Sequence, residues 1–323
     1  MKNKTALIIV YFGQVPSFIN LFLKGCERNR DIDFLFFTDW DWTKLPSLCN
    51  VMNIPFSMQQ FNKKATEKCG IDINVNVGYK LCDLKPAWPH ILEEYVVGYD
   101  FVGYCDIDLI FGRINRFFTE DVKKYADIFT ITREYLSGAL TIFRNTPRIF
   151  RLYQEAKGWK DIFQDPRHFA FDEYLRINDV IDSDGVKRNK NQSFSDLVLD
   201  TSSVVLYNDK YIGYEKRPRL AVFDHGAIYA ENEEWVFFHY VVAKQSVFWT
   251  IPGWSDIPDK FFINQYGFYR SEYCSLSFMD LLGNPYYRKQ VISSIKKKSG
   301  TVQKLIRKCD IKRLFNAVLK QFK

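Results

Sequence analysis

Residues 100–112 read DFVGYCDIDLIFG, an apolar run that carries two carboxylates, Asp106 and Asp108, separated by one isoleucine. In a strand, residues i and i+2 face the same side, so we expect both carboxylates to project together while Ile107 points into the core. Two like charges in an apolar neighbourhood are retained mainly where a cation lies between them. Carboxylate oxygens suit Mg²⁺ or Mn²⁺. The alternative is a strand end with two solvated aspartates.

The composition indicates a folded globular protein. The chain has 323 residues, of which 47% are apolar and 17% aromatic, and this excludes a disordered protein. Its seven cysteines form no C-x-x-C pair, so neither a zinc site nor a disulfide framework is expected. No apolar run approaches the roughly 20 residues of a membrane span, and the N-terminal run lacks a cleavage site. We therefore expect a cytoplasmic protein.

The positive charge is concentrated at the C-terminus. The net charge is +7, but residues 286–323 contain twelve Lys or Arg residues against one acid, Asp310. The rest of the chain is therefore acidic and need not bind nucleic acid. Apolar residues alternate with the basic ones, as in helices that lie on anionic membranes; the alternative is a helix whose apolar side packs on the protein or a partner. We expect a domain over residues 1–270, a basic amphipathic helical region over 271–323, and a peripheral location on the inner face of the plasma membrane.

Buried strands alternate with helices along the first half of the chain. Apolar strands are predicted over residues 6–13 and 32–39, and a helix that Ser17 could cap is predicted over 17–27. This order indicates a βαβ unit, in which ligands bind at the carboxyl ends of the strands. One rim would then carry Tyr11, Phe12, Gly13, Thr38 and Asp39. Asp39 could equally be a turn residue. Later strands are predicted over 51–56, 126–132, 136–145 and within 204–229, and helices over 58–69, 113–125 and 146–159.

Two further segments are candidates for binding a phosphorylated ligand. Residues 79–95 predict a helix with Lys80, Asp83 and Lys85 near its first turns, where a phosphate could bind; the alternative is a pair of surface lysines. Ser137 and Gly138 begin a strand, and small residues there permit close approach of a bulky ligand.

Three more side chains have both a functional and a structural interpretation. Asp172 and Glu173 are adjacent at a predicted helix start, where they could form a catalytic or substrate-binding pair or could simply favour the helix dipole. His239 lies in an apolar run, where it could be a core residue or an additional ligand for Mn²⁺.

Taken in order, these features resemble the nucleotide-sugar glycosyltransferases of the GT-A fold. The resemblance rests on the strand–helix–strand unit that ends at Thr38-Asp39, the D-x-D of Asp106 and Asp108, the Ser137-Gly138 strand, and His239 with Lys244. The resemblance covers residues 1–250, and within this class of enzymes the chain looks closest to small bacterial polysaccharide and lipopolysaccharide transferases. It implies an α/β, Rossmann-like fold with a mixed, mostly parallel central sheet flanked by helices, followed by the basic helical tail.

The resemblance also implies roles for individual residues. Asp108 would bind the divalent cation directly, and Asp106 through water or by touching the ribose and sugar. His239 would complete the metal site, and Lys244 would contact phosphate. The family's H-x-x-G-x-x-K pattern is only partly kept, because the glycine is absent and the lysine stands one position early. The nucleoside would lie against Tyr11, Thr38 and Asp39, and the sugar and acceptor against Ser137, Gly138 and the Asp172-Glu173 pair.

The predicted activity is metal-dependent transfer of a sugar from a nucleoside-diphosphate sugar, of the UDP type, to a saccharide or lipid-linked saccharide acceptor. Asp172 or Glu173 would act as general base in an inverting enzyme, whereas His239 favours a retaining one. Two alternatives remain. A nucleotidyltransferase or other Mg²⁺-dependent phosphoryl-transfer enzyme also requires paired aspartates, and a non-catalytic saccharide-binding protein would explain the aromatic residues.

Overall fold

The chain folds around a seven-stranded sheet, in a computed structural model that describes residues 3–174, 191–207, 210–246, 249–254 and 256–270. The strand order is β3-β2-β1-β4-β7-β6-β8. Only β7 runs antiparallel to its two neighbours, so the predicted mixed, mostly parallel sheet is confirmed. The strands are β1 (Thr5–Tyr11), β2 (Ile32–Thr38), β3 (Val51–Pro55), β4 (Phe101–Cys105), β6 (Ile128–Thr130), β7 (Leu140–Arg144) and β8 (Leu206–Tyr207).

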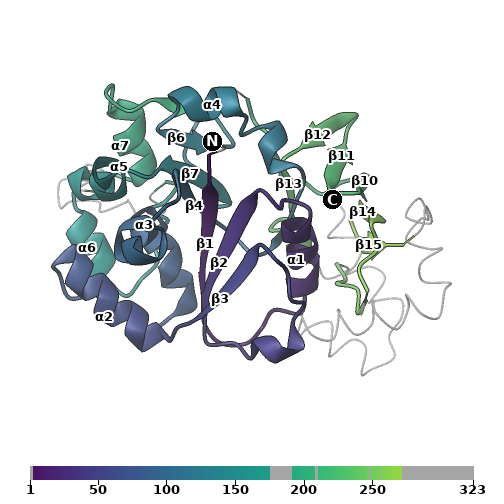
Figure 1. The fold of residues 1–323 in the computed structure, drawn as a ribbon, viewed down its shortest axis with the longest axis horizontal. Coiled ribbons are helices and arrows are strands. Elements are labelled where there is room, and N and C mark those ends of the chain that lie inside the picture. The colour runs from purple at the N-terminus through teal and green to yellow at the C-terminus, as the bar shows by residue number, and fades with distance from the viewer. Residues whose placement is uncertain (1–2, 175–190, 208–209, 247–248, 255, 271–323) are drawn as a thin grey trace, which may run out of the picture.

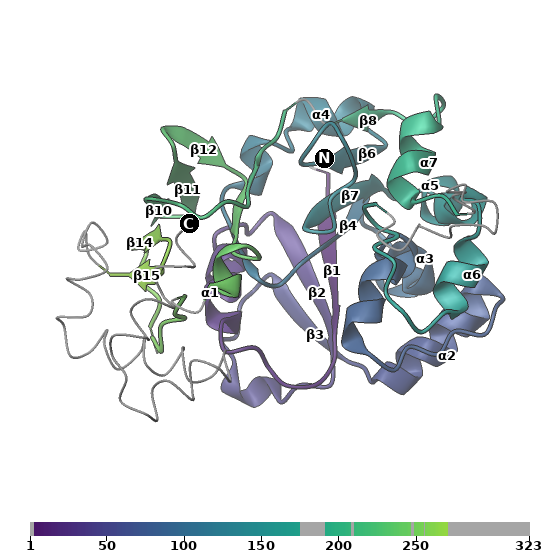
Figure 2. The same ribbon diagram turned by 180° about the vertical axis from the view of Figure 1, so that it is seen from behind.

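Both faces of this sheet are covered, which explains why its strands read as continuous apolar runs. In β1, Ala6, Ile8 and Val10 belong to one hydrophobic core, whereas Leu7 and Ile9 belong to the other. Figures 1 and 2 show α2 (Met58–Cys69) and α3 (Trp88–Ile91) on one side of the strands and α1 (Ile19–Glu27) on the other. The predicted βαβ architecture is therefore present, and the carboxyl ends of β1 and β4 meet at one edge.

The helices agree with the sequence in part. Helix α2 has the predicted bounds, because Ser57 and Gln60 form a capping box before it and Gly70 adopts a left-handed conformation after it. The Ser17 cap is wrong, since the N-cap of α1 is Phe18 and makes no side-chain hydrogen bond. The remaining helices are short: α4 (Glu120–Tyr125), α5 (Pro147–Arg151), α6 (Trp159–Gln164), α7 (Phe194–Asp200) and the 3-10 helices η1 (Trp42–Lys44), η4 (Ile114–Arg116), η5 (Leu152–Glu155) and η6 (Ala243–Gln245).

The single helix predicted over residues 79–95 is wrong. The segment forms the 3-10 helix η2 (Gly78–Ala87), then α3, then the 3-10 helix η3 (Glu93–Tyr95). Pro86 and Pro89 lack the backbone N–H that a continuous α-helix needs, and each proline ring crowds the preceding turn. The predicted helices over 113–125 and 146–159 are likewise divided into short α- and 3-10 segments.

Two smaller sheets lie beside the main one. A three-stranded sheet has the order β5-β13-β9, and an antiparallel sheet has the order β12-β11-β10-β14-β15 around a third hydrophobic core. The short strands predicted between 204 and 229 are confirmed. The strands are β5 (Leu109–Phe111), β9 (Gly213–Tyr214), β10 (Ala221–Asp224), β11 (Ala227–Ala230), β12 (Glu233–Trp235), β13 (Phe237–His239), β14 (Lys260–Asn264) and β15 (Gly267–Tyr269).

The predictions for the basic tail over residues 271–323 concern residues outside those described. Among the described residues, every helix is too short or too polar to span a lipid bilayer.

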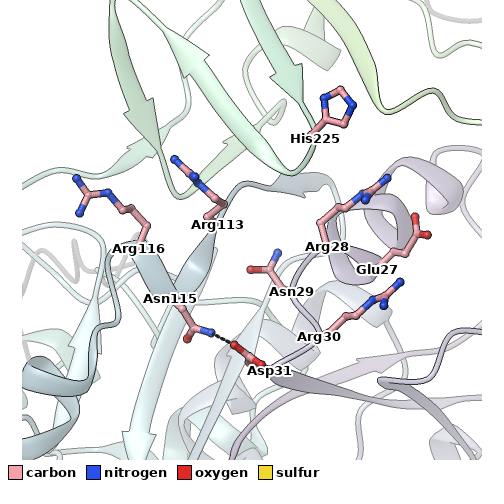
Figure 3. Close-up of a pocket in the computed structure, with 9 residues that line it drawn as sticks. All are labelled: Glu27, Arg28, Asn29, Arg30, Asp31, Arg113, Asn115, Arg116 and His225. Carbon is pink, nitrogen blue, oxygen red and sulfur yellow. Dashed lines mark hydrogen bonds between the residues drawn. The ribbon is translucent and has the colours of Figure 1, made fainter.

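A cavity of about 540 Å³ lies where three connections meet at the amino end of β2 (Figure 3). These are the α1–β2 connection, the segment after β5 and the tip of the β10–β11 hairpin. Two of its arginines are already engaged, because Arg28 pairs with Asp259 and Arg113 with Glu234. The buried amide of Asn29 joins two of these connections: it donates to the carbonyl oxygens of Gly25 and Gly112 at 2.8 Å and accepts from the N–H of Ile114 at 2.9 Å.

We predict that Asn29→Ala lowers the free energy of unfolding by about 1–3 kcal/mol, because it removes three buried hydrogen bonds, two to carbonyl oxygens and one from a backbone N–H. Denaturant titration followed by circular dichroism would measure this loss. Asn115→Ala is the matched control, since the Asn115 amide donates one exposed hydrogen bond to Asp31 at 3.1 Å; its effect should stay within about 0.5 kcal/mol. Equal effects of the two substitutions would contradict the prediction.

Candidate functional site

Another cavity opens at the carboxyl edge of the main sheet and holds about 630 Å³, a volume suited to a small-molecule ligand. Asp106 and Asp108 line it together with His239, Lys85 and Lys244. The two aspartates were expected within a strand, and this is wrong: β4 ends at Cys105 and β5 begins at Leu109, so they lie in the connection between. Ile107 is buried in the core as predicted.

His239 reaches the aspartates through strand pairing. Strand β13 runs antiparallel to β5, and His239 is paired with Leu109, the residue directly after Asp108. The imidazole Nε2 lies 3.1 Å from Asp108 Oδ1 and 3.9 Å from Asp106 Oδ2. Asp106, Asp108 and His239 thus each offer one possible ligand atom, and these three atoms lie within 4.8 Å of one another. Two carboxylates and one imidazole form a donor set that suits Mn²⁺ or Mg²⁺.

The charges in this cluster balance one another. Burial lowers the pKa of His239, but its hydrogen bonds to Asp108 and Glu215 outweigh burial and raise it to about 10. Burial raises the pKa of Asp108, yet His239 and Lys244 hold it below its usual value. The ammonium of Lys244 contacts Asp108 Oδ2. Without a metal, the carboxylates are thus neutralised by the protein's own cations.

A second group of charges surrounds the buried side chain of Lys85. Its ammonium lies 2.6 Å from Asp106 Oδ1 and 3.6 Å from Asp172 Oδ2, and it donates to the carbonyl of Gly138 at 2.9 Å. Burial by itself lowers the pKa of Lys85, but the neighbouring acids raise it well above its usual value. Lys85 is therefore a permanent cation that joins the D-x-D to the Asp172-Glu173 pair.

Asp172 and Glu173 line the same cavity. Neither Asp172 nor Glu173 is helical, and the residues after Tyr174 that would continue the predicted helix lie outside those described. Glu173 Oε1 accepts a hydrogen bond from the N–H of Gly138 at 2.9 Å. Any side chain at Gly138 would meet Asp172, because a Cβ there would lie 2.6 Å from Asp172 Oδ2. Burial is the main cause that raises the pKa of both acids.

Lys80 and Asp83 are buried and bind the polypeptide itself. Lys80 Nζ lies 2.8 Å from Asp83 Oδ2 and 2.9 Å from the carbonyl of Arg167. Asp83 accepts from the N–H groups of Phe169 and Phe171. The Lys80–Asp83 pair thereby fixes the loop that carries Asp172. Neither Lys80 nor Asp83 lines the cavity itself. An acidic cluster of Asp83, His168 and Asp172 also exists, but Lys80 already neutralises Asp83.

The remaining predicted residues divide into two groups. Tyr11, Phe12 and Gly138 line the cavity. The other four lie outside the cavity lining and make local hydrogen bonds: Gly13, Thr38, Asp39 and Ser137. The N–H of Gly13 donates to Asp39 Oδ1 at 2.8 Å. Thr38 Oγ1 accepts from Trp42 Nε1 at 2.9 Å, and Ser137 Oγ accepts from the N–H of Ala139 at 3.1 Å. The Asp39 contact fits its interpretation as a turn residue.

Glu215 belongs to this site although it was not predicted from the sequence. This residue follows β9, which pairs with β13, and its Oε1 lies 2.7 Å from His239 Nδ1. Tyr211 donates its hydroxyl to Glu215 Oε2 at 2.5 Å. Glu215 stands in a polar stretch without a motif or periodic pattern, so nothing in the sequence singles it out.

Comparison with known proteins places the chain in a family. Over residues 7–271 it matches a family of unknown function (DUF6625), and it belongs to that family. No curated protein matches it. A structure of the galactosyltransferase LgtC with donor and acceptor sugar analogues matches at a TM-score of 0.34 and 12% identity, over 52% of this chain and 70% of LgtC. The glycosyltransferase GlyE of Streptococcus pneumoniae TIGR4 matches at a TM-score of 0.27 and 14% identity, over 52% and 45%. These TM-scores are too low for either likeness to carry an argument.

The raised pKa of His239 predicts how the stability of the metal-free protein depends on pH. A pKa raised from 6.5 to about 10 means that protonated His239 stabilises the fold; this contribution is complete below pH 6.5 and is lost as the pH rises through about 10. The difference in melting temperature between the wild type and His239→Asn should therefore shrink across that range. Thermal unfolding in the presence of a chelator measures it, and a constant difference would refute the protonation assigned to His239.

Proposed function

We propose that this protein is a metal-dependent glycosyltransferase of the GT-A type that moves a sugar from a nucleoside-diphosphate sugar to a saccharide hydroxyl. The observation that supports this most is the convergence of Asp106, Asp108 and His239 on a cavity that also contains the Asp172-Glu173 pair. A bound divalent cation would neutralise the charge that develops on the leaving diphosphate. The three converging residues would hold it.

The chain's own residues supply the other requirements of this reaction. Lys244 places an ammonium group at the D-x-D, where it can bind a phosphate oxygen of the donor, and the buried Lys85 adds a second positive charge there. Tyr11 and Phe12 offer aromatic surface in the same cavity for the nucleoside. Lys244 is 43% exposed, so an entering ligand can reach its ammonium group.

Glu173 is the proposed proton acceptor. It is half-buried, whereas Asp172 is buried beside Lys85, so Glu173 is the more accessible of the two acids. Its raised pKa makes it a stronger base than an ordinary carboxylate. In an inverting reaction it would take the proton of the acceptor hydroxyl while the bond between the anomeric carbon and the diphosphate oxygen breaks. In a retaining reaction the same carboxylate would stabilise the positive charge at the anomeric carbon.

An Mg²⁺-dependent phosphoryl-transfer enzyme is the second candidate, because paired aspartates beside a lysine serve that chemistry as well. The acid pair at 172 and 173 favours glycosyl transfer, in which a base or a charge-stabilising carboxylate is needed beside the cation site. The products distinguish the two activities. A glycosyltransferase releases a nucleoside diphosphate from a nucleotide sugar, whereas a nucleotidyltransferase releases pyrophosphate from a nucleoside triphosphate.

We predict that a nucleoside-diphosphate sugar raises the melting temperature of the wild type in the presence of Mn²⁺, because a ligand that binds only the native state stabilises it. A thermal-shift screen of UDP-, GDP- and dTDP-sugars would identify the donor, and a CMP-sugar, which has one phosphate only, would serve as the comparison. Asp108→Ala should abolish the Mn²⁺-dependent part of the shift. An unchanged shift in this variant would defeat the site assignment, and no shift by any donor in the wild type would defeat the proposed function.

We predict that Glu173→Gln lowers kcat by roughly 10²–10⁴-fold, the range expected for loss of a general base or a charge-stabilising carboxylate. Because glutamine preserves the shape of the side chain, the donor-induced thermal shift should remain close to that of the wild type. Release of nucleoside diphosphate in the presence of acceptor provides the rate. A variant with nearly full activity would exclude Glu173 from the reaction.

A further inference from the structure

Glu215 lies behind His239, on the side of the imidazole ring opposite the D-x-D. Nδ1 of His239 is 2.7 Å from Glu215 Oε1, whereas Nε2 is 3.1 Å from Asp108 Oδ1. The two ring nitrogens therefore have different partners: Nε2 faces the D-x-D, and Nδ1 faces Glu215.

We propose that Glu215 is the positioning residue of the cation site: it keeps the Nδ1 proton on His239, so that Nε2 presents its lone pair to the cation. This inference rests on the cation site of the proposed function. A neutral imidazole carries one proton, and a metal can bind only the nitrogen that lacks it. A carboxylate that accepts the other N–H fixes both the tautomer and the orientation of a metal-bound histidine.

The surroundings of Glu215 hold it in that position. Strand β9 ends at Tyr214 and pairs in parallel with β13, with Tyr214 opposite Phe238, so the backbone brings the next residue, Glu215, beside the end of β13. The hydroxyl of Tyr211 donates to the second carboxylate oxygen at 2.5 Å. Both oxygens of Glu215 are thus used, one by Tyr211 and one by His239, and its side chain is only 20% exposed.

A different role would produce the same contacts. His239 could serve only as an imidazolium that neutralises Asp108 and Glu215, in which case Glu215 would stabilise the fold without affecting the affinity for a cation. The two roles differ in their response to an isosteric substitution, because Glu215→Gln removes the charge but keeps an oxygen that can accept the Nδ1 proton.

The experiment is a titration of the full-length protein with Mn²⁺ alone, monitored by the electron paramagnetic resonance signal of free Mn²⁺. Glu215→Ala should weaken Mn²⁺ binding roughly 10–100-fold, the usual effect of removing a carboxylate behind a histidine ligand. Glu215→Gln should recover most of that loss. Tyr211→Phe, which leaves the carboxylate in place but frees one oxygen, should weaken binding less than Glu215→Ala and covers the case in which the alanine variant fails to fold.

The chain provides a matched control. Asp224 Oδ1 lies 2.6 Å from Nδ1 of His225, the same kind of contact, at the exposed tip of the β10–β11 hairpin. Asp224→Ala should leave Mn²⁺ affinity unchanged.

The outcomes separate this inference from the proposed function. If the wild type binds Mn²⁺ and Glu215→Ala binds it equally tightly, or if Glu215→Gln loses as much affinity as Glu215→Ala, the positioning role is overturned. If the wild type binds no Mn²⁺, the cation site and the positioning role both fail. If the Mn²⁺ affinities follow the expected order but no nucleotide sugar is turned over, the role of Glu215 is supported and the glycosyltransferase function fails.

Discussion

The mutual repulsion of buried carboxylates is the constraint on which this structure depends. Asp106, Asp108, Asp172 and Glu173 all line one cavity, and burial penalises the charged forms of the last three. Two buried cations make the arrangement stable. Lys85 lies between Asp106 and Asp172, and His239 lies between Asp108 and Glu215. Such an arrangement costs free energy of desolvation, and groups perturbed in this way are concentrated at functional sites.

The scaffold brings these charges together from separate parts of the chain. The main sheet delivers the D-x-D at the end of β4, η2 delivers Lys85, and the loop after α6 delivers Asp172 and Glu173. Strand β5 follows the D-x-D directly and pairs with β13. This pairing brings His239 beside the D-x-D. The buried Lys80–Asp83 pair then fixes the loop of the acid pair through the N–H groups of Phe169 and Phe171.

Local patterns predicted the parts of the fold that local interactions stabilise. The apolar runs of β1, β2 and β4 could be predicted directly, since burial on both faces leaves a clear sequence signal, and α2 was predicted with its observed bounds although its capping box was not recognised. The helix over 79–95 could not, because prolines 86 and 89 and tertiary contacts of Lys80 and Asp83 decided its form. The same two residues bind the backbone of Arg167, Phe169 and Phe171, and these tertiary contacts could not be predicted from the adjacent acids Asp172 and Glu173.

The sequence by itself determined the class of the fold, because hydrophobic periodicity is a local property, and it singled out Asp106 and Asp108, although it placed them in a strand and not in the connection after β4. Only the tertiary structure decided which other residues join them. Strand register brings His239 beside Asp108 and Glu215 behind His239, although the three residues are far apart in the chain. Register is set by pairing between strands that are distant in sequence, and it leaves no mark on the residues that it brings together.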